Sequence, residues 1–357
     1  MSVSLNRVSL NRVSLNRVSL NRRSLLWGAG ALGLGALVSG CSSSEAPAPA
    51  DPDGGSRTIA HKYGSTQISG TPQRVVTVGL TDQDYLLALG TVPVGVRDWF
   101  GDQPGALWPW AREKAGGTVP AVLPIETLPI EQVAALRPDL IVGPSSGLTQ
   151  AEYDALSGIA PTVAQPAEFA DYGAPWQTIT EMVGAALGRT EQAAGLVRDV
   201  EARFAQVRAA NAGFAGRTGL LATVLEDGSY YAYAEGPAPR FLVDLGLDLP
   251  PATAGIFTGP ERAPVGLSRE QLSLLEADVA LVGLYGDKAA GQIAADPVVQ
   301  NLRVAREGRI VAMPELSTLN GALSFGSVLS LPVALEQAPP RIAAALDGNP
   351  ATAVAPG

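Results

Sequence analysis

One loop of the sequence gathers the side chains best suited to hold a large ligand. Three of the five tryptophans fall within residues 97–110, together with an arginine and a phenylalanine: Arg97, Trp99, Phe100, Trp108 and Trp110. Glycines and prolines lie between them without a helical or strand period, and rigid aromatic loops favour the recognition of a large, partly apolar ligand. Arg97 could pair with an anionic group of that ligand. The alternative is a loop whose tryptophans pack on one another as a small core.

The place of this loop in the chain supports the ligand-binding interpretation. Residues 74–78 and 93–96 are short apolar runs typical of buried parallel strands, with a helix between them that begins near Tyr85 and ends at Gly90. In an open parallel sheet, ligands collect in the loops that follow the strands. The loop after Val96 is therefore where we expect the ligand.

A second group of polar aromatic residues lies in the later half of the chain. The run Tyr230-Tyr-Ala-Tyr233 has the composition of a strand, and Arg240 follows it. Because side chains alternate along a strand, Tyr231 and Tyr233 share one face and Tyr230 points to the other. These tyrosines are candidates to line a cleft.

The segment Gly143-Pro-Ser-Ser-Gly147 matches the nucleophile elbow of one class of hydrolases. Enzymes of that class need a histidine after the serine in chain order. The single histidine, His61, lies upstream, so we do not expect an esterase or any other enzyme. The loop is better suited to supply hydroxyl and backbone N–H groups to a ligand, or to itself.

Histidine and cysteine are almost absent. With one cysteine, Cys41, the chain cannot form an internal disulfide, and with one histidine it cannot build the usual transition-metal site, which takes several such ligands. We therefore expect no cofactor and no metal site of the protein's own. If the protein handles a transition metal, another molecule must supply most of the ligands.

The charge of the chain excludes other partners. The first 40 residues hold five arginines and no acids, so the remainder carries 20 basic against 34 acidic side chains. Nucleic acid demands a basic face, so we expect no nucleic-acid partner. Because the chain after residue 40 is acidic, charge alone would not attract it to anionic lipid either.

A helix-plus-strand pattern occurs twice. Residues 130–142 combine a helical apolar face with a buried run, and residues 268–282 align with 129–143 without a gap. Glu131 falls on Glu270 in this alignment, each in a first helical turn, where the helix dipole favours an acid. Ser268 and the glutamine three residues later form a capping box. The repeat predicts two similar α/β lobes, each with its own sheet.

The N-terminal region has the pattern of an export signal. Four copies of Val-Ser-Leu-Asn-Arg occupy residues 3–22 as low-complexity sequence, and an apolar stretch follows Arg22 and Arg23. The arginine pair resembles a twin-arginine signal. The segment ending at Cys41 resembles a lipobox, which would make Cys41 the lipidated residue; the alternative is an uncleaved anchor with a chance cysteine.

Three further segments complete the pattern. Residues 176–187 are predicted to form a helix that ends at Gly188, Thr190 is expected to cap a long amphipathic helix that reaches Ala210, and the apolar run 219–225 opens the later half. The long helix lies between the two similar halves and is the natural connector.

Together these patterns predict an α/β fold of two similar lobes joined by one long helix. The expected boundaries are an export signal with lipobox (1–40), a flexible tether (41–57), an N-terminal lobe (58–188), a connecting helix (189–212), a C-terminal lobe (213–346) and a disordered tail (347–357).

Short segments in this order resemble the iron-siderophore ABC-transporter substrate-binding lipoproteins, a group that also includes cobalamin- and haem-binding members. The resemblance covers about residues 58–345 and rests on Pro72–Val76, Leu86–Gly90 followed by Pro93–Val96, Glu131–Val142, Ser157–Pro161, Ala186–Arg189, Ser268–Val282 and Gly308–Val311.

The resemblance implies a lipid-anchored protein on the outer face of the cell membrane that captures a ferric siderophore and delivers it to an ABC permease. It implies two α/β lobes joined by a long helix with the ligand cleft between them, and docking of Glu131 and Glu270 onto permease arginines. Some hydroxamate-binding members have an arginine directly before the first of these acids; this chain has none there. Its substitute is the 97–110 loop, opposed in the other lobe by Tyr231, Tyr233, Arg240, Tyr285 and Phe325.

Iron would be bound only through its chelator, and the chain is expected to act as a monomer. The alternatives are a cobalamin- or haem-binding protein of the same fold, an exported esterase, and a surface sensor that binds ligand without delivering it. Haem usually takes an axial histidine or tyrosine, and here only tyrosines are available.

Overall fold

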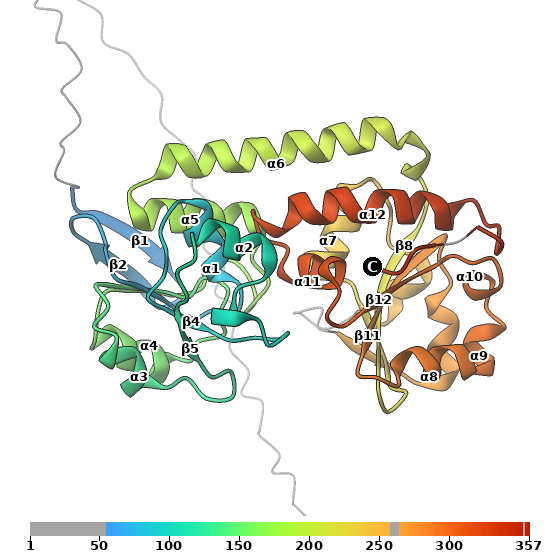
Figure 1. Cartoon of the computed structure of the whole chain (residues 1–357), viewed down its shortest axis with the longest axis horizontal. Coiled ribbons are helices and arrows are strands. Elements are labelled where there is room, and N and C mark those ends of the chain that lie inside the picture. Colours follow the sequence, from blue (N-terminus) through green and yellow to red (C-terminus); the bar gives the residue numbers. More distant parts are fainter. Residues whose placement is uncertain (1–54, 258–263, 353) are drawn as a thin grey trace, which may run out of the picture. The chain divides into compact units, whose positions relative to one another are not determined.

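The computed structural model describes residues 55–257, 264–352 and 354–357. By its contacts the chain divides into two units, Met1–Ala50 and Asp51–Gly357, and all described residues belong to the second. Figure 1 shows their helices and strands. The expected export signal, with Arg22 and Arg23, and the expected lipidation site Cys41 lie outside the described residues.

The N-terminal lobe is built on a five-stranded parallel sheet with the strand order β5-β4-β3-β6-β7. Its strands are short and mostly buried, as expected when helices cover both faces. A hairpin of β1 (Arg57–His61) and β2 (Gly64–Ile68) precedes them. The sheet consists of β3 (Val75–Thr77), β4 (Gly95–Arg97), β5 (Ala121–Leu123), β6 (Leu140–Val142) and β7 (Thr162–Val163).

The helices of this lobe follow the predicted pattern closely. The helix predicted over 176–187 is α5 (Trp176–Leu187), and Gly188 ends it in the left-handed conformation that glycine adopts without steric cost. The others are α1 (Asp82–Ala88), the short 3₁₀ helix η1 (Pro104–Ala106), α2 (Pro109–Lys114), α3 (Ile130–Ala135) and α4 (Gln150–Ser157).

One long helix, α6 (Thr190–Ala210), joins the two halves and packs against both α5 and α12 (Ser330–Leu346). Figure 1 shows it alongside these two helices. The apolar face predicted for it is buried at Ala193, Val197, Val200 and Phe204. Thr190, which we expected to cap this helix, is instead its first residue, and Arg189 precedes it without a side-chain cap.

The C-terminal lobe carries a second five-stranded sheet with the order β10-β9-β8-β11-β12. The strands β8, β11 and β12 are parallel, whereas β9 and β10 pair in antiparallel fashion. The strands are β8 (Gly219–Leu225), β9 (Tyr230–Tyr233), β10 (Val265–Leu267), β11 (Val279–Tyr285) and β12 (Ile310–Pro314). The helices are α7 (Pro237–Asp244), α8 (Ala289–Ala295), α9 (Pro297–Gln300), α10 (Arg303–Arg306), α11 (Thr318–Phe325) and α12, with 3₁₀ segments η2 (Ala212–Phe214), η3 (Pro251–Gly255) and η4 (Arg269–Leu275).

Two α/β lobes, each with its own sheet, are joined by one long helix, and this confirms the predicted fold class. The sequence repeat marks equivalent places, because β6 and β11 each stand fourth in the order of their sheet. The two helical parts differ: α3 is an α-helix, whereas η4 is a 3₁₀ helix that keeps the predicted capping box at Ser268.

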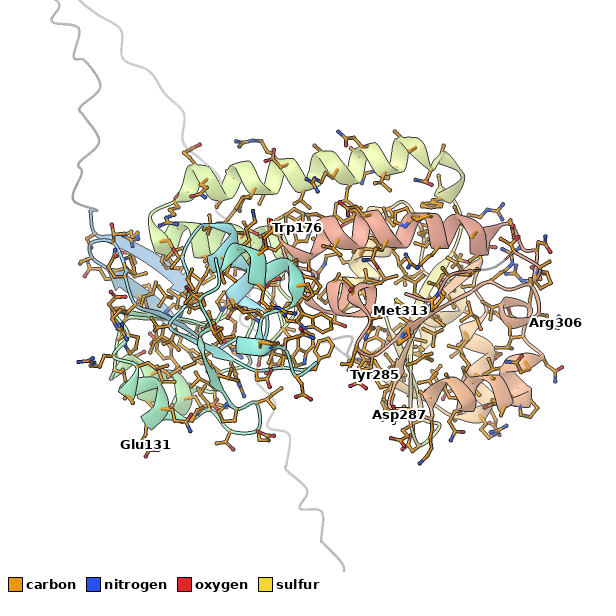
Figure 2. All side chains as sticks on the ribbon, viewed as in Figure 1. Glu131, Trp176, Tyr285, Asp287, Arg306 and Met313 are labelled. Carbon is orange, nitrogen blue, oxygen red and sulfur yellow. The ribbon has the colours of Figure 1, made fainter. Side chains whose placement is uncertain are left out.

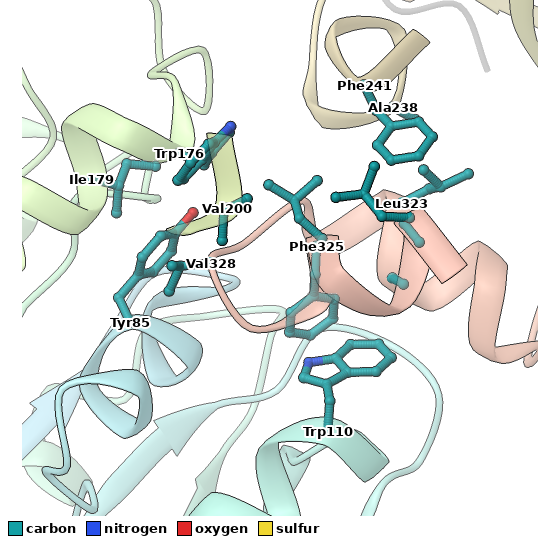
Figure 3. Packing of buried hydrophobic residues seen from close by; sticks show 14 of the residues in the cluster. Tyr85, Trp110, Trp176, Ile179, Val200, Ala238, Phe241, Leu323, Phe325 and Val328 are labelled. Carbon is teal, nitrogen blue, oxygen red and sulfur yellow. The ribbon is translucent and has the colours of Figure 1, made fainter. Parts of the chain in front are cut away.

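The largest hydrophobic core runs through both lobes. It combines Val75 and Leu140 of the first sheet with Leu281 and Val311 of the second, and α11 and α12 contribute to it. Figure 3 shows part of this packing, with the ring of Phe325 next to that of Trp110. The other face of each sheet has a smaller core of its own. Burial of apolar side chains from both lobes in one core holds the lobes together.

The C-terminal segment differs from the expected disordered tail. Arg341 in α12 donates hydrogen bonds to the carbonyl oxygens of Ala355 and Pro356, and the Gly357 amide donates to the Ala312 carbonyl at 2.9 Å. The end of the chain therefore lies against β12 and α12. Its small, weakly apolar residues gave no sign of this, because these hydrogen bonds are made by its backbone.

Candidate functional site

A cavity of about 480 Å³ lies between the two lobes. This volume is within the usual range of small-molecule sites. Most of its wall is apolar, and its main contributors are Leu80, Thr81, Tyr85, Trp99, Ser145, Asp171, Tyr172, Trp176 and Ile179 from the N-terminal lobe and Tyr233, Glu235, Pro237, Arg240, Phe241, Asp244, Phe325 and Leu331 from the C-terminal lobe.

The N-terminal wall is formed where parallel strands end. Thr81 follows β3, Trp99 follows β4 and Ser145 follows β6, so three loops at the carboxyl edge of one sheet meet at the cavity. The Thr81 hydroxyl donates a hydrogen bond to the Ser145 hydroxyl at 3.0 Å. Ligands in open α/β sheets are expected at this edge, and the loop after Val96 does contribute to the cavity.

Trp99 is the residue of the 97–110 loop that reaches the cavity. Its ring lies 4.8 Å from that of Phe100 and 5.4 Å from that of Phe325, which belongs to the other lobe and also lines the cavity. Phe100 does not line the cavity; it packs between Trp99 and Trp108. The predicted pair Trp99 and Phe325 thus forms one side of the site.

Trp108 and Trp110, which we predicted to contact the ligand, do not line the cavity. They stack on each other with ring centroids 5.2 Å apart, and both are buried in the core shared by the lobes. Gly321 of α11 leaves the space that Trp108 fills: a Cβ built there would lie 2.4 Å from the indole ring. The alternative of packed tryptophans is the one that the structure supports, with the other lobe completing the packing.

The guanidinium groups of the two predicted arginines, Arg97 and Arg240, donate hydrogen bonds to backbone carbonyl groups. Arg97 lies outside the cavity and donates to the carbonyl oxygens of Val78 and Ile125, at 3.4 and 2.7 Å. Arg240 lines the cavity, but its guanidinium donates to Gly173 and Ala174 of the other lobe at 3.0 and 3.5 Å. Arg240 therefore connects the lobes across one edge of the site.

The tyrosines predicted to contact the ligand, Tyr231, Tyr233 and Tyr285, lie on one face of the second sheet. Of these, Tyr233 lines the cavity. The Tyr233 hydroxyl is 3.2 Å from that of Thr223, and burial raises the pKa of Tyr233, with Tyr285 and Tyr231 adding to the shift. Tyr231 and Tyr285 do not line the cavity. Figure 2 labels Tyr285, whose hydroxyl accepts a hydrogen bond from the Asn320 amide at 3.4 Å.

Several cavity residues were not predicted from the sequence. Tyr85 and Trp176 stood in segments that we assigned only to helices, and Asp244 ends α7. The segment 170–174 had no pattern. The one available signal was the run Asp82-Gln83-Asp84 at the start of a buried helix, since charged residues are rarely buried without a reason.

These two aspartates are fully buried beside the cavity. Burial raises the pKa of each to about 7, although hydrogen bonds oppose the shift. Asp82 accepts a hydrogen bond from the Ser145 amide at 2.9 Å. Asp84 accepts from the Trp110 indole N–H at 2.8 Å and from the Ser327 hydroxyl, which belongs to the loop between α11 and α12. Asp84 therefore joins the two lobes through a buried carboxyl group.

His61 is buried in β1, 2.9 Å from the Thr66 hydroxyl, and does not line the cavity. Among the described residues, no group of three or more histidine, cysteine, aspartate or glutamate residues could hold a metal ion.

The predicted docking acids Glu131 and Glu270 are both exposed, in the first turns of α3 and η4. Figure 2 labels Glu131, whose side chain points away from the rest of the lobe. No helix in the described residues is long and apolar enough to cross a membrane.

Comparison with known proteins gives consistent results. The chain is 26% identical over 289 residues to the probable siderophore-binding lipoprotein YfiY of Bacillus subtilis (strain 168). The alignment covers 76% of this chain and 85% of YfiY. It is 26% identical to the Fe(3+) dicitrate-binding periplasmic protein FecB of Escherichia coli (strain K12), with 72% of this chain and 81% of FecB covered.

The structure is similar to the crystal structure of a periplasmic solute binding protein from Mycobacterium smegmatis str. MC2 155. The TM-score is 0.73 at 37% sequence identity, with 82% of this chain and 99% of that chain covered. A family model described as periplasmic binding protein matches residues 75–316. With two α/β lobes around a cavity and a family match over most of its length, the chain belongs to the periplasmic binding protein family.

Proposed function

We propose that this protein captures a ferric siderophore in the cavity between its lobes and delivers it to an ABC permease for iron uptake. The observation that carries the proposal is the cavity itself, which is lined by both lobes and lies at the carboxyl edge of a parallel sheet. The names of YfiY and FecB, a siderophore-binding and a ferric dicitrate-binding protein, supply the ligand class.

In this proposal the chelator holds the iron and the protein holds the chelator. The wall offers neutral hydroxyls from Thr81, Ser145 and Tyr233 and apolar surface from Trp99 and Phe325. Such a wall suits an organic ligand with a few polar groups. Haem and cobalamin remain the alternatives of the same fold; for haem, the described lining of the cavity holds no histidine, but Tyr85, Tyr172 and Tyr233 line it and a tyrosine can serve as an axial ligand.

A fluorescence titration tests the ligand class. Ferric siderophores, cobalamin and haem are added in turn to the chain from residue 42 onward, which contains the whole compact unit Asp51–Gly357. A ferric chelate is expected to quench tryptophan emission saturably, because Trp99 lines the cavity. The change Trp99→Ala should weaken binding about ten-fold, the effect of losing about 1.4 kcal/mol of contact energy.

The control for this titration is Leu316→Ala, which removes an apolar side chain that is 63% exposed and outside the cavity. It should leave the affinity unchanged. Calorimetry repeats the titration, since a ligand could bind without altering the fluorescence. If no ferric chelate binds by either method, the siderophore proposal is wrong.

Delivery is proposed to use Glu131 and Glu270, one exposed acid on each lobe. The double change Glu131→Lys and Glu270→Lys should reduce iron uptake by cells by about ten-fold or more, because like charges facing the permease arginines repel. The affinity of the purified protein should not change. Radioactive iron uptake and titration measure the two effects separately.

Glu191 provides the matched control, because it is also an exposed acid in a first helical turn, that of α6. Uptake by cells carrying Glu191→Lys should equal that of the unchanged protein. Normal uptake by the Glu131/Glu270 double variant would instead favour a surface sensor that binds ligand without delivering it.

Export and anchoring complete the proposal. The Arg22–Arg23 pair, the apolar segment and the lipobox-like end at Cys41 support an exported protein held on the outer face of the membrane by a lipid on Cys41. The lipoprotein name of YfiY agrees with this. Membrane fractionation of cells that make the Cys41→Ser variant tests it: retention in the membrane fraction would contradict a lipid on this residue.

A further inference from the structure

Tyr172 is a half-exposed aromatic residue of the cavity wall, held in an unusual backbone conformation. It lines the cavity and is 51% exposed. The Gly173 amide donates to the Ala170 carbonyl at 2.9 Å, so Tyr172 is the third residue of a tight turn, and its φ angle is 63°. This turn position with a positive φ is usually taken by glycine or asparagine. Such a conformation persists only where the surroundings hold it, and it is common at ligand sites.

The residue before Tyr172 is fixed within the N-terminal lobe. The carboxylate of Asp171 pairs with the Lys62 ammonium at 2.7 Å and accepts a hydrogen bond from the Gln165 amide at 3.0 Å. Gln165 is buried, and its amide oxygen accepts from the Ser146 hydroxyl at 3.3 Å. The turn is therefore tied to the serine-rich loop that follows β6.

Gly147 of that loop leaves the space for the tyrosine ring. A Cβ built on Gly147 would lie 2.8 Å from both Cε2 and the hydroxyl oxygen of Tyr172, so a larger residue would displace the ring. Gly147 does not line the cavity, and its own φ angle lies outside the left-handed region. The missing side chain thus serves the position of the ring rather than the backbone of the loop.

The two residues after Tyr172 are held by the other lobe. The guanidinium of Arg240, in α7, donates to the carbonyl oxygens of Gly173 and Ala174 at 3.0 and 3.5 Å. A ligand anion that used this guanidinium would have to displace both carbonyl groups. The turn is therefore held from both lobes, with Tyr172 between the two attachments.

On the basis of the proposed function, we propose that the ring of Tyr172 contacts the ligand, and that Gly147 and Arg240 are positioning residues that keep the ring at the cavity. An exposed aromatic ring suits the apolar or planar part of an organic chelator. Arg240 acts on the ligand through Tyr172 and not as a receptor for an anionic group. Because it belongs to the other lobe, this contact depends on the relative position of the lobes.

Substitutions of Tyr172 test the contact. Calorimetry with the chain from residue 42 onward uses ferrichrome, ferric dicitrate and ferric enterobactin as probes, and the probe with the lowest Kd is taken for all variants. Tyr172→Ala should weaken binding about ten-fold, and Tyr172→Phe, which keeps the ring, less than about two-fold. Unchanged affinity of Tyr172→Ala, or an equal loss in both variants, would overturn the ring contact.

The control for these variants is Tyr153→Ala, because Tyr153 is a partly exposed tyrosine of α4 that does not line the cavity. Its Kd should equal that of the unchanged protein.

Double-mutant cycles test the positioning roles. Arg240→Gln and Gly147→Ala should each weaken binding several-fold in the unchanged protein, because the ring is no longer held in place. In the Tyr172→Ala background, each should change the Kd by less than about two-fold. The same loss in both backgrounds would show that the residue acts on the ligand directly or through the lobes as a whole, and would overturn its positioning role.

Hydrogen exchange of the Gly173 amide gives a measurement without ligand. Arg240→Gln should speed this exchange several-fold, because the turn loses its attachment to the other lobe. Arg306→Gln alters an exposed arginine of α10 outside the cavity and should change neither exchange nor affinity. Unchanged exchange in Arg240→Gln would overturn the positioning role of Arg240.

Failure of this proposal differs from failure of the proposed function. If a ferric chelate binds but Tyr172→Ala does not weaken it, the siderophore function stands and the contact by Tyr172 is wrong. If none of the three probes binds, the proposed function has failed, and the ligand contact of Tyr172 fails with it. The exchange of the Gly173 amide still decides in that case whether Arg240 holds the turn.

Discussion

Replacing Trp108 by alanine is expected to lower the free energy of unfolding by about 3–5 kcal/mol, the usual cost of removing a large aromatic side chain from a core. The side chain is only 2% exposed and stacks on Trp110. It also fills the space above Gly321, a residue of the opposite lobe. The loss should therefore loosen the packing between the lobes as well as within one of them.

Denaturant unfolding followed by circular dichroism measures this effect. The comparison variant is Trp99→Ala, whose side chain is only partly buried at the cavity wall and should cost clearly less stability but more affinity. An unchanged midpoint for Trp108→Ala together with lost ligand binding would restore the ligand-contact interpretation of this residue.

A double-mutant cycle keeps the test informative if Trp108→Ala does not fold. A methyl group added at Gly321 would collide with the indole ring, so Gly321→Ala should be destabilising on its own. In a Trp108→Phe background the smaller ring leaves room, and the same change should cost less. Additive effects of the two changes would show that these residues do not contact each other.

The second large effect is the loss, as the pH rises from about 4 to 7, of the stability that the protonated Asp84 contributes. The pKa of Asp84 is raised from 3.8 to about 7 by burial, so between these values the folded state holds a proton that the unfolded state has released. The contribution of Asp84 to stability is then full below pH 3.8 and is lost as the pH rises through 7. A shift of this size corresponds to about 4 kcal/mol for the single group.

Asp84→Asn should flatten the profile. The amide oxygen can still accept hydrogen bonds from Trp110 and Ser327, but it does not ionise, so the contribution of Asp84 to the slope disappears. Asp82, whose pKa is also raised to about 7, keeps the remaining slope. Denaturant unfolding at intervals from pH 4 to 8 gives both curves.

Asp248→Asn, at an exposed position, should leave the profile unchanged and serves as the control. If Asp84→Asn has the same slope as the unchanged protein, the carboxyl group is not protonated by burial. A steeper slope would contradict the assignment as well.

Much of the fold could be predicted because its signals are local. A short apolar run, a helix-breaking glycine and a capping box depend on neighbouring residues, which is why the helices at 176–187 and 190–210 and the strand at 219–225 were found close to their actual bounds. The repeat of 130–142 at 268–282 also revealed two equivalent lobes, since β6 and β11 occupy matching places in their sheets.

The site depended on residues far apart in the chain. The sequence identified the 97–110 loop and predicted Trp99 and Phe325 near the ligand, and both line the cavity. It could not separate Trp99 from Trp108, because both are tryptophans in a loop rich in glycine and proline. The difference is made by Gly321, more than 200 positions later, whose missing side chain admits one ring into the shared core.

The sequence by itself thus determined the lobes, their helices and strands, and the loop that reaches the ligand cavity. Only the tertiary structure decided which side chains face that cavity. The guanidinium of Arg240 donates a hydrogen bond to a carbonyl group of the other lobe, and the buried carboxyl group of Asp84 accepts a hydrogen bond from the Ser327 hydroxyl. The physical reason is that distant segments pack against a side chain and decide both how deeply it is buried and which of its hydrogen-bonding groups stay free. The local sequence determines only the conformation of the backbone that carries the side chain.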